Sequence, residues 1–434
     1  MTAANELLKL KEGEIQIEAS QLRPGVHVRL PVQWMDHHFM FNSFVIENEE
    51  QAQQIAAMQL PKLFCDVTRC KIPPLPKPLK PAPPDPEKIA EEARLAALRV
   101  VQMAEKVART KVMSELRGRL DTAQKHYIGA AKAIGNAITS FDANPGESVR
   151  QVTLVSEQST AALLADPDSA IVLIAEKAQA DGHAAHSLSV MTLSLLLGKQ
   201  AMLPPEALHA LGISALLHDI GKLAISSSIL RNTSRNKHEE AVYQEHSRIG
   251  YESALRSRRL SQPVLDAILH HHERMDGSGF PDHLTKNDIH LAARVIAIAN
   301  RFDNLANPID YRKALSPSEA LATMWSKEQS AFDTVLLQLF IRAMGVYPPG
   351  SIVQLTDGRV GAVVASAMTD SPLSPQVMIY EPEVPRRQAI IVDLAKDTSL
   401  KIDHPLRLQG RPDEELDYLL PRRKLNWFHM ENQS

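Results

Sequence analysis

Five separated clusters in the middle of the chain carry side chains that could do chemistry together. They are His186; His218 and Asp219 followed by Lys222; His246; the run His270–His272; and Asn300 with Asp303. Neutral imidazole and carboxylate are both good ligands for a borderline divalent cation. A buried His-Asp pair is costly unless something pairs with it, and a metal would do so. Lys222 lies on about the same helical face as the pair, where it can meet an anion held by the metal.

The segment HHHERMDGSGFP, residues 270–281, joins three histidines to a glycine-rich loop. Apolar residues at 264, 265, 268 and 269 predict a preceding helix whose buried face leads into the histidines. Neighbouring helix positions are about 100° apart, so only two of the three histidines can share one broad face. We expect His271 and His272 to face inward and His270 to face away. Gly277 and Gly279 permit close approach of backbone N–H groups to an anionic ligand.

The sequence patterns of the segments that carry and flank these clusters predict a mainly α fold with two small flanking modules. Apolar residues recur at helical spacing through the centre, and Asp357-Gly358 between alternating stretches predicts a hairpin near the C-terminal end. We expect a small α+β N-terminal domain (1–70), a proline-rich linker (71–86), a long connector of one or two helices (87–142), a helical bundle (150–345), and a small β module with a tail (346–434).

Composition limits the classes of partner. The 434 residues, 44% of them hydrophobic, suffice for two or three domains with cores of their own, and a net charge of −3 creates no global attraction to nucleic acid or an anionic membrane. We therefore expect neither as a partner. Cys65 and Cys70 match no common zinc spacing and are expected to be reduced thiols. No apolar run reaches about 18 residues, and the charged N-terminus is unlike a signal peptide, so we expect a cytoplasmic protein.

The ordered set HS, HDIGK, H and HHE.MDGSGFP resembles the HD-GYP domain, a subclass of the HD metal-dependent phosphohydrolases. The "GYP" stands here as Gly279-Phe280-Pro281. The resemblance covers roughly residues 150–345, with the clusters in the family's order. The segment IQIEASQLRPGVHVRL, with the later run from Trp34 to Phe39, resembles an N-terminal domain of unknown function that often precedes HD-GYP in bacteria.

This resemblance implies an HD-type helical bundle that holds two or three iron or manganese ions and hydrolyses cyclic di-GMP. The resemblance assigns Asp219 and Lys222 to catalysis, with Asp219 bridging two ions and Lys222 binding a phosphate oxygen. Two cations roughly 3.5–4 Å apart would clamp a phosphodiester and lower the pKa of a bridging water. The implied metal ligands are His186, His218, Asp219, His246, His271, His272 and Asn300, and the implied substrate contacts are Lys222, Gly277, Gly279, Phe280, Pro281 and Arg312.

Three positions depart from the family's pattern. Asn300 stands where the family has an aspartate ligand, and Ile309 replaces the first arginine of a phosphate clamp of which Arg312 remains. Gly182 stands where members with three metals have an acidic ligand, so we expect two ions.

These departures leave other functions open. One alternative is a catalytically degenerate domain that acts as a nucleotide sensor or a scaffold for other proteins, and another is a phosphodiesterase for a different phosphoester. Partner signalling proteins at the N-terminal domain and a homodimer through the long helical connector also remain open.

Overall fold

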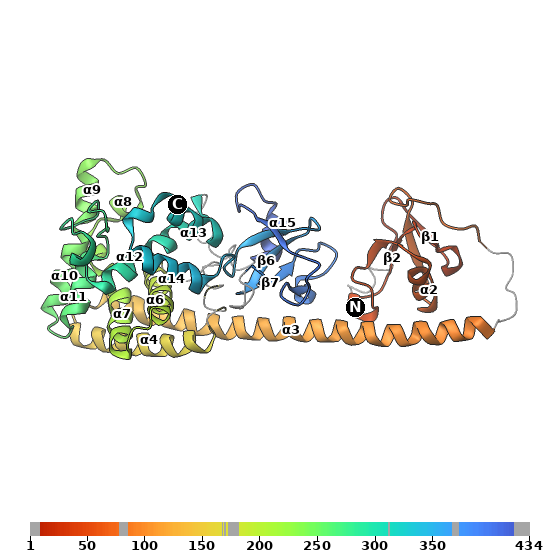
Figure 1. The fold of residues 1–434 in the computed structure, drawn as a ribbon, viewed down its shortest axis with the longest axis horizontal. Helices are drawn as coiled ribbons and strands as arrows, with labels where there is room; N and C mark the ends of the chain where they lie inside the picture. Colours follow the sequence, from red (N-terminus) through yellow and green to blue (C-terminus); the bar gives the residue numbers. More distant parts are fainter. Residues whose placement is uncertain are drawn as a thin grey trace. The chain divides into compact units, whose positions relative to one another are not determined.

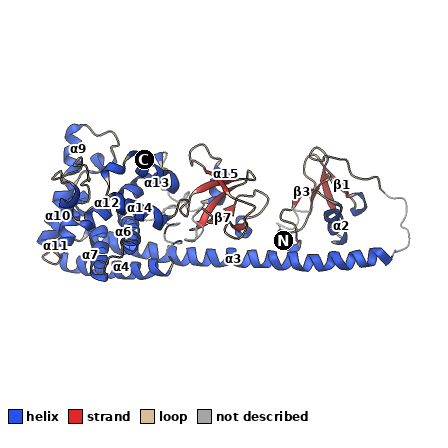
Figure 2. Cartoon of the chain, viewed as in Figure 1, coloured by secondary structure: helices blue, strands red, loops and turns tan. Residues whose placement is uncertain are grey.

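Helices make up most of the chain, and the strands gather in two antiparallel sheets (Figure 1, Figure 2). The computed structural model describes residues 9–77, 86–166, 168, 171, 182–310, 313–366 and 373–420. The predicted fold class, mainly α with a small α+β part and a small β part, is confirmed. The chain divides into two compact units, Met1–Glu115 with Glu381–Ile390 and Leu116–Tyr380 with Ile391–Ser434, which are described separately.

The first unit is built on a four-stranded sheet of order β1-β4-β2-β3. Its strands are β1 (Glu14–Ile17), β2 (His27–Arg29), β3 (Ser43–Val45) and β4 (Leu63–Asp66). Helix α2 (Glu49–Ala57) begins at Asn48, whose side chain accepts a hydrogen bond from the Gln51 N–H. Arg29 forms a buried ion pair with Glu14 at 2.6 Å, and the free thiols of Cys65 and Cys70 lie 3.3 Å apart.

A single helix, α3 (Pro86–Thr139), follows the proline-rich segment. In the first unit, the Lys106 ammonium on α3 donates a hydrogen bond to the His37 carbonyl. In the second unit, apolar residues of α3 such as Ile134 belong to the main core. There the Tyr127 hydroxyl of α3 donates to the Ala185 carbonyl at 2.9 Å, next to a candidate metal ligand.

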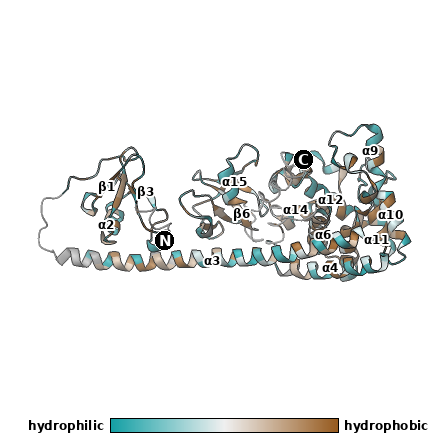
Figure 3. Cartoon of the chain, turned by 180° about the vertical axis from the view of Figure 1, so that it is seen from behind, coloured by the Kyte–Doolittle hydropathy of each residue, from teal (hydrophilic) through white to brown (hydrophobic). Residues whose placement is uncertain are grey.

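The second unit is a helical bundle with one continuous hydrophobic core. Helix α6 is buried on almost every side and packs on α7, α12 and α14, and brown, hydrophobic stretches recur along the bundle helices in Figure 3. Prolines occupy the first turn of α4, α7, α11 and α13, where a missing N–H costs nothing. The helices are α4 (Pro145–Ala165), α6 (Gly182–Gln200), α7 (Pro205–Leu217), α8 (Ser227–Arg231), α9 (Lys237–Gln244), α10 (His246–Arg256), α11 (Gln262–His270), α12 (Leu291–Ala306), α13 (Pro317–Lys327) and α14 (Thr334–Met344).

The C-terminal β module is a five-stranded antiparallel sheet of order β8-β7-β6-β5-β9. The expected hairpin joins β5 (Ile352–Leu355) to β6 (Val360–Ala365), and Gly358 takes the positive φ of +87° that its turn needs. Strands β7 (Gln376–Ile379), β8 (Ile391–Asp393) and β9 (Ile402–Pro405) complete the sheet, and a short helix, α15 (Asp413–Leu419), follows it. Within the described residues, no helix has both the length and the apolar character that crossing a bilayer requires.

Candidate metal centre

The His-Asp pair lies at the buried end of α7. His218 is the C-cap residue of α7, and Asp219 is the N-cap residue of a short 3-10 turn, η3 (Ile220–Ala224). The turn carries Lys222 back toward the pair, so that its ammonium lies 2.6 Å from Oδ2 of Asp219. Both side chains are largely buried, with 5% of Asp219 and 13% of Lys222 exposed.

Gly221 explains how a second helix comes close enough to contribute ligands. A Cβ atom at this position would lie 2.0 Å from the His246 carbonyl oxygen and 2.5 Å from the Gly250 N–H nitrogen. Only a glycine allows α10 to rest directly on η3. His246 is the first residue of α10, so this backbone contact places its ring next to Asp219.

Three histidines are held in the same tautomer by the same local contact. In each, Nδ1 lies within hydrogen-bonding distance of the carbonyl three residues earlier: His218 with Ala215 at 2.7 Å, His246 with Tyr243 at 2.5 Å, and His271 with Ile268 at 2.7 Å. A carbonyl can only accept, so Nδ1 carries the proton. Each neutral ring therefore presents the lone pair of Nε2 on its other side.

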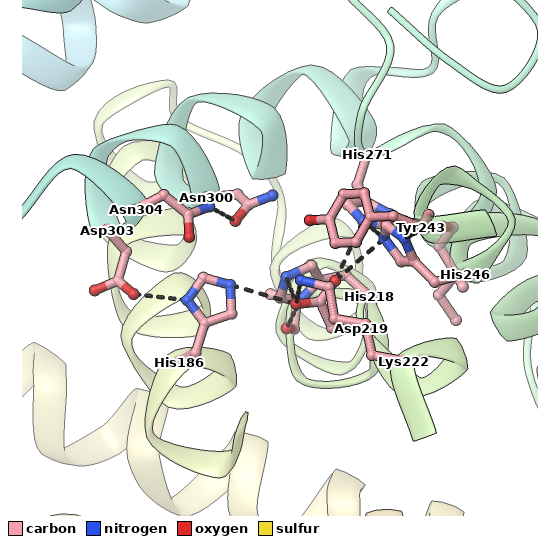
Figure 4. Close-up of polar contacts among 12 residues, drawn as sticks. His186, His218, Asp219, Lys222, Tyr243, His246, His271, Asn300, Asp303 and Asn304 are labelled. Atoms are coloured by element: carbon pink, nitrogen blue, oxygen red, sulfur yellow. Dashed lines mark hydrogen bonds and ion pairs between the residues drawn. The ribbon is translucent and has the colours of Figure 1, made fainter. Parts of the chain in front are cut away.

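These lone pairs converge on the two oxygens of Asp219. Oδ2 lies 3.5 Å from Nε2 of His186 and 3.4 Å from Nε2 of His218. Oδ1 lies 3.4 Å from Nε2 of His246 and 3.6 Å from Nε2 of His271. Figure 4 shows His186 on one side of Asp219 and His246 with His271 on the other. His272 joins the second group, so Asp219 is shared by two sets of ligand atoms, each within 4.8 Å of one another.

Buried atoms in both sets lack the partner that their chemistry requires. Nε2 of His186, His218 and His272 and Oδ1 of Asp219 are buried without a hydrogen bond. The Nε2 atoms of His246 and His271 are only 3.3 Å apart, although both present lone pairs. Facing acceptors repel unless a cation lies between them. Imidazole nitrogens and a carboxylate are ligands that bind divalent metal ions well, so this set of donors fits such ions.

The pKa values agree with ligands that are ready to bind a cation. Burial lowers the pKa of His271, takes that of His272 well below its usual value, and lowers that of His246 to about 3. Burial alone would raise the pKa of Asp219, but His218 and Lys222 hold it well below the usual range. His246, His271 and His272 are thus neutral and the Asp219 carboxylate is ionised near neutral pH.

Asp303 on α12 orients His186 through the ring nitrogen that faces away from Asp219. Its Oδ2 accepts a hydrogen bond from Nδ1 of His186 at 2.6 Å, which turns Nε2 toward Asp219. Asn300, one turn earlier and 3% exposed, accepts a hydrogen bond through Oδ1 from Asn304 at 2.7 Å. The oxygen expected to ligate a metal is thus already engaged, although the side chain lies on the site's side of α12 (Figure 4). Arg312 lies outside the described residues.

The expected substrate loop is fixed to the ligand histidines. The Phe280 ring stacks on His272 with centroids 4.5 Å apart, and the Phe280 N–H donates to the His272 carbonyl. A Cβ atom at Gly279 would lie 2.4–2.5 Å from backbone atoms of residues 272–274, so the loop needs glycine there. Pro281 follows through a cis peptide bond, and Gly277 has φ +77°.

Glu273 and Asp282, two acidic residues beside this loop, form hydrogen bonds with groups other than Asp219. Both oxygens of Glu273 accept backbone N–H groups, from Asp282 and Leu284. His270 turns away to Asp282, at 3.0 Å. The structure thus brings His271 and His272, but not the third histidine of the run, to the shared carboxylate.

Sequence reasoning missed Tyr243. Its ring lies beside His246, with centroids 5.0 Å apart, at the edge of the cluster (Figure 4). The Lys222 ammonium lies 5.5 Å from the ring centroid. Burial would lower the pKa of Lys222, but Asp219, with Tyr243 next, raises it. A tyrosine three residues before a ligand histidine was the available signal, because only two residues separate them at the junction of α9 and α10.

A helical bundle that directs five imidazoles at one shared carboxylate defines a class of protein: the HD-type metal-binding domains. Comparison with known families agrees. Residues 168–336 match the family described as HD domain, and residues 14–152 match a domain of unknown function, DUF3391. The second match covers the small N-terminal domain, the proline-rich segment and the whole of the long helix α3.

A relative that matches most of the chain identifies the group more closely. The chain is 30% identical over 391 residues to the cyclic di-GMP phosphodiesterase PA4108 of Pseudomonas aeruginosa, covering 88% of this chain and 89% of that one. It is 37% identical over 150 residues to the cyclic di-GMP phosphodiesterase response regulator RpfG of Xanthomonas campestris, covering 34% and 39%. A solved HD-GYP protein from Bdellovibrio bacteriovorus, Bd1817, aligns with TM-score 0.42 and 16% identity over 75% of this chain and 98% of that one. The chain belongs to the HD-GYP family of HD-domain proteins with an N-terminal DUF3391 domain.

Proposed function

We propose that this protein is a metal-dependent phosphodiesterase that hydrolyses cyclic di-GMP in second-messenger signalling. The observation that carries the proposal is the set of buried, unpartnered lone pairs arranged on both sides of Asp219. The names of the relatives support cyclic di-GMP as the substrate. Two divalent ions, iron or manganese, fit the two groups of nitrogen and carboxylate donors.

The chain's own residues would divide the work as follows. His186 and His218 would hold one cation and His246, His271 and His272 the other, with Asp219 shared between them. When bound, such ions supply the Lewis acidity that activates water for attack on a phosphodiester.

Lys222 would bind and orient a phosphate oxygen, because its ammonium lies within 2.6 Å of the shared carboxylate. The loop Gly277–Pro281 would border the substrate, since Phe280 already lies on a ligand ring.

The test is a comparison of metal content and turnover in purified variants. Wild-type protein loaded anaerobically with Fe²⁺ or Mn²⁺ should retain metal after desalting and convert cyclic di-GMP to a linear product on chromatography. His218→Gln should lose both properties while keeping its helical circular dichroism. His209→Gln is the matched control, because that side chain is 46% exposed and lies outside the cluster. Equal turnover by metal-loaded wild type and His218→Gln would contradict the proposal.

A second candidate function rests on Asn300. Its neutral amide is hydrogen bonded to Asn304 where the family has a charged ligand, which favours a weakly loaded site that binds nucleotide without cleaving it. Saturable binding of cyclic di-GMP by metal-loaded protein without any product would support this sensor or scaffold.

A further inference from the structure

An arginine from the segment between α8 and α9 covers the ring that borders the candidate metal centre. The Arg235 guanidinium lies 3.8 Å from the centroid of the Tyr243 ring, a close cation–π contact. Its Nε donates to the Ile229 carbonyl at 3.1 Å, which ties the side chain to the end of α8. The side chain is only 17% exposed, so the guanidinium has a defined position.

This guanidinium is close to Lys222. Arg235 and Lys222 lie 3.8 Å and 5.5 Å from the same ring centroid, so the two cationic groups are at most about 9 Å apart. Their roles differ, because Lys222 is paired with Asp219 at 2.6 Å. Arg235 has a weaker acidic partner: Glu240 lies 3.5 Å from Nη1, and its own side chain is 41% exposed.

The remaining hydrogen-bonding capacity of Arg235 suits a phosphate. Within the described part of the chain, no acceptor is hydrogen bonded to its Nη2. A guanidinium offers two parallel donors to a phosphate, and the ion pair of Arg235 with the more exposed Glu240 is long and therefore weak. A phosphate can therefore displace Glu240 at little cost.

We infer that Arg235 binds the second, unreacting phosphate of a cyclic dinucleotide, with Tyr243 as the platform that holds the guanidinium. The inference rests on the proposed function, because it assumes that the first phosphate lies beside Asp219 and Lys222. One nucleotide separates the two phosphates in each direction around the ring, so two cationic groups that lie at most about 9 Å apart can each face one of them. Binding energy from this remote phosphate selects cyclic dinucleotides over simple phosphodiesters.

The test compares two substrates that share the reacting group. Cyclic di-GMP has two phosphates, and bis(p-nitrophenyl) phosphate has one. Arg235→Gln should lower the ratio of kcat/KM for cyclic di-GMP to kcat/KM for bis(p-nitrophenyl) phosphate by about tenfold to a hundredfold, mainly through KM. Arg235→Lys keeps the positive charge but loses the planar pair of donors, so its substrate ratio should lie between those of wild type and Arg235→Gln. Arg231→Gln, an equal loss of charge at the exposed last residue of α8, should keep the wild-type ratio.

Equilibrium binding makes the result independent of turnover. Calorimetry with metal-loaded protein should show Kd for cyclic di-GMP rising by a similar factor in Arg235→Gln. An unchanged substrate ratio and an unchanged Kd would overturn the inference while leaving the phosphodiesterase intact. If wild type hydrolyses neither substrate, the proposed function fails, and a Kd raised only by the Arg235 variants still supports the phosphate contact.

Discussion

Substitution of Gly221 by alanine should dismantle half of the candidate metal centre without touching a ligand. The new Cβ atom would lie 2.0 Å from the His246 carbonyl oxygen, whereas ordinary contact begins at 3.4 Å. Helix α10 must therefore retreat by about 1.4 Å, and if it moves as a body the distance from Nε2 of His246 to Oδ1 of Asp219 grows from 3.4 Å to at most about 4.8 Å. Metal–ligand distances tolerate only about 0.2 Å.

The expected loss has two parts. Metal affinity at the group containing His246 should fall by at least about 10- to 100-fold, the usual effect of losing a residue that orients a ligand. The metal-free protein should lose about 1–3 kcal/mol of unfolding free energy through overpacking.

A competition titration against a chelator and urea unfolding of metal-free protein measure the two effects. The matched control is Gly129→Ala, because nothing lies within 4 Å of a Cβ atom at that helical position. The control should be neutral or slightly more stable. Wild-type metal affinity in Gly221→Ala would refute the proposal that this backbone contact positions His246.

Three further predictions concern the same residues. Asn300→Asp should raise metal retention and turnover, because it supplies a charged ligand on α12; a decrease of both, measured by metal analysis and product chromatography, would show that this position is not a ligand. Asp303→Asn should weaken metal binding by about 10- to 100-fold in a chelator competition, since His186 loses its anionic acceptor; unchanged affinity would exclude this orienting role. Because the folded-state pKa of His246 is about 3 against 6.5 unfolded, its contribution to the stability of metal-free protein is complete above about pH 6.5 and is lost as pH falls toward 3. Urea unfolding should therefore give about 2 kcal/mol less stability at pH 5 than at pH 7 from this residue, and His246→Gln should show a smaller decrease.

The sequence predicted those parts of the site that depend on local pattern. Two of three adjacent histidines were expected to face inward, and the structure turns His271 and His272, just past the end of α11, toward Asp219 while His270 turns to Asp282. The alternating stretch around Asp357-Gly358 likewise predicted a hairpin, because its register depends on only a few neighbouring residues. Such features follow from spacing alone.

Features that depend on packing between distant segments could not be predicted from the spacing of residues. Nothing in the spacing shows that Asp303 would bond to His186, which lies 117 residues earlier. Tyr243 and Arg235 meet only because α9 folds back over its preceding segment, and aromatic or basic residues at such positions are usually solvated. The insertion of β4 between β1 and β2 and the helix α15 after the last strand also went unforeseen, since both are fixed by long-range contacts.

The stacking of Phe280 on His272 joins the nucleotide-side loop to a metal ligand mechanically. An imidazole that rotates to receive a cation must carry the phenyl ring with it, together with the glycines on which the loop turns. Binding of the ions would therefore shift the loop as well as the imidazole. In the proposed phosphodiesterase, a shortage of metal would therefore also weaken the response to the messenger.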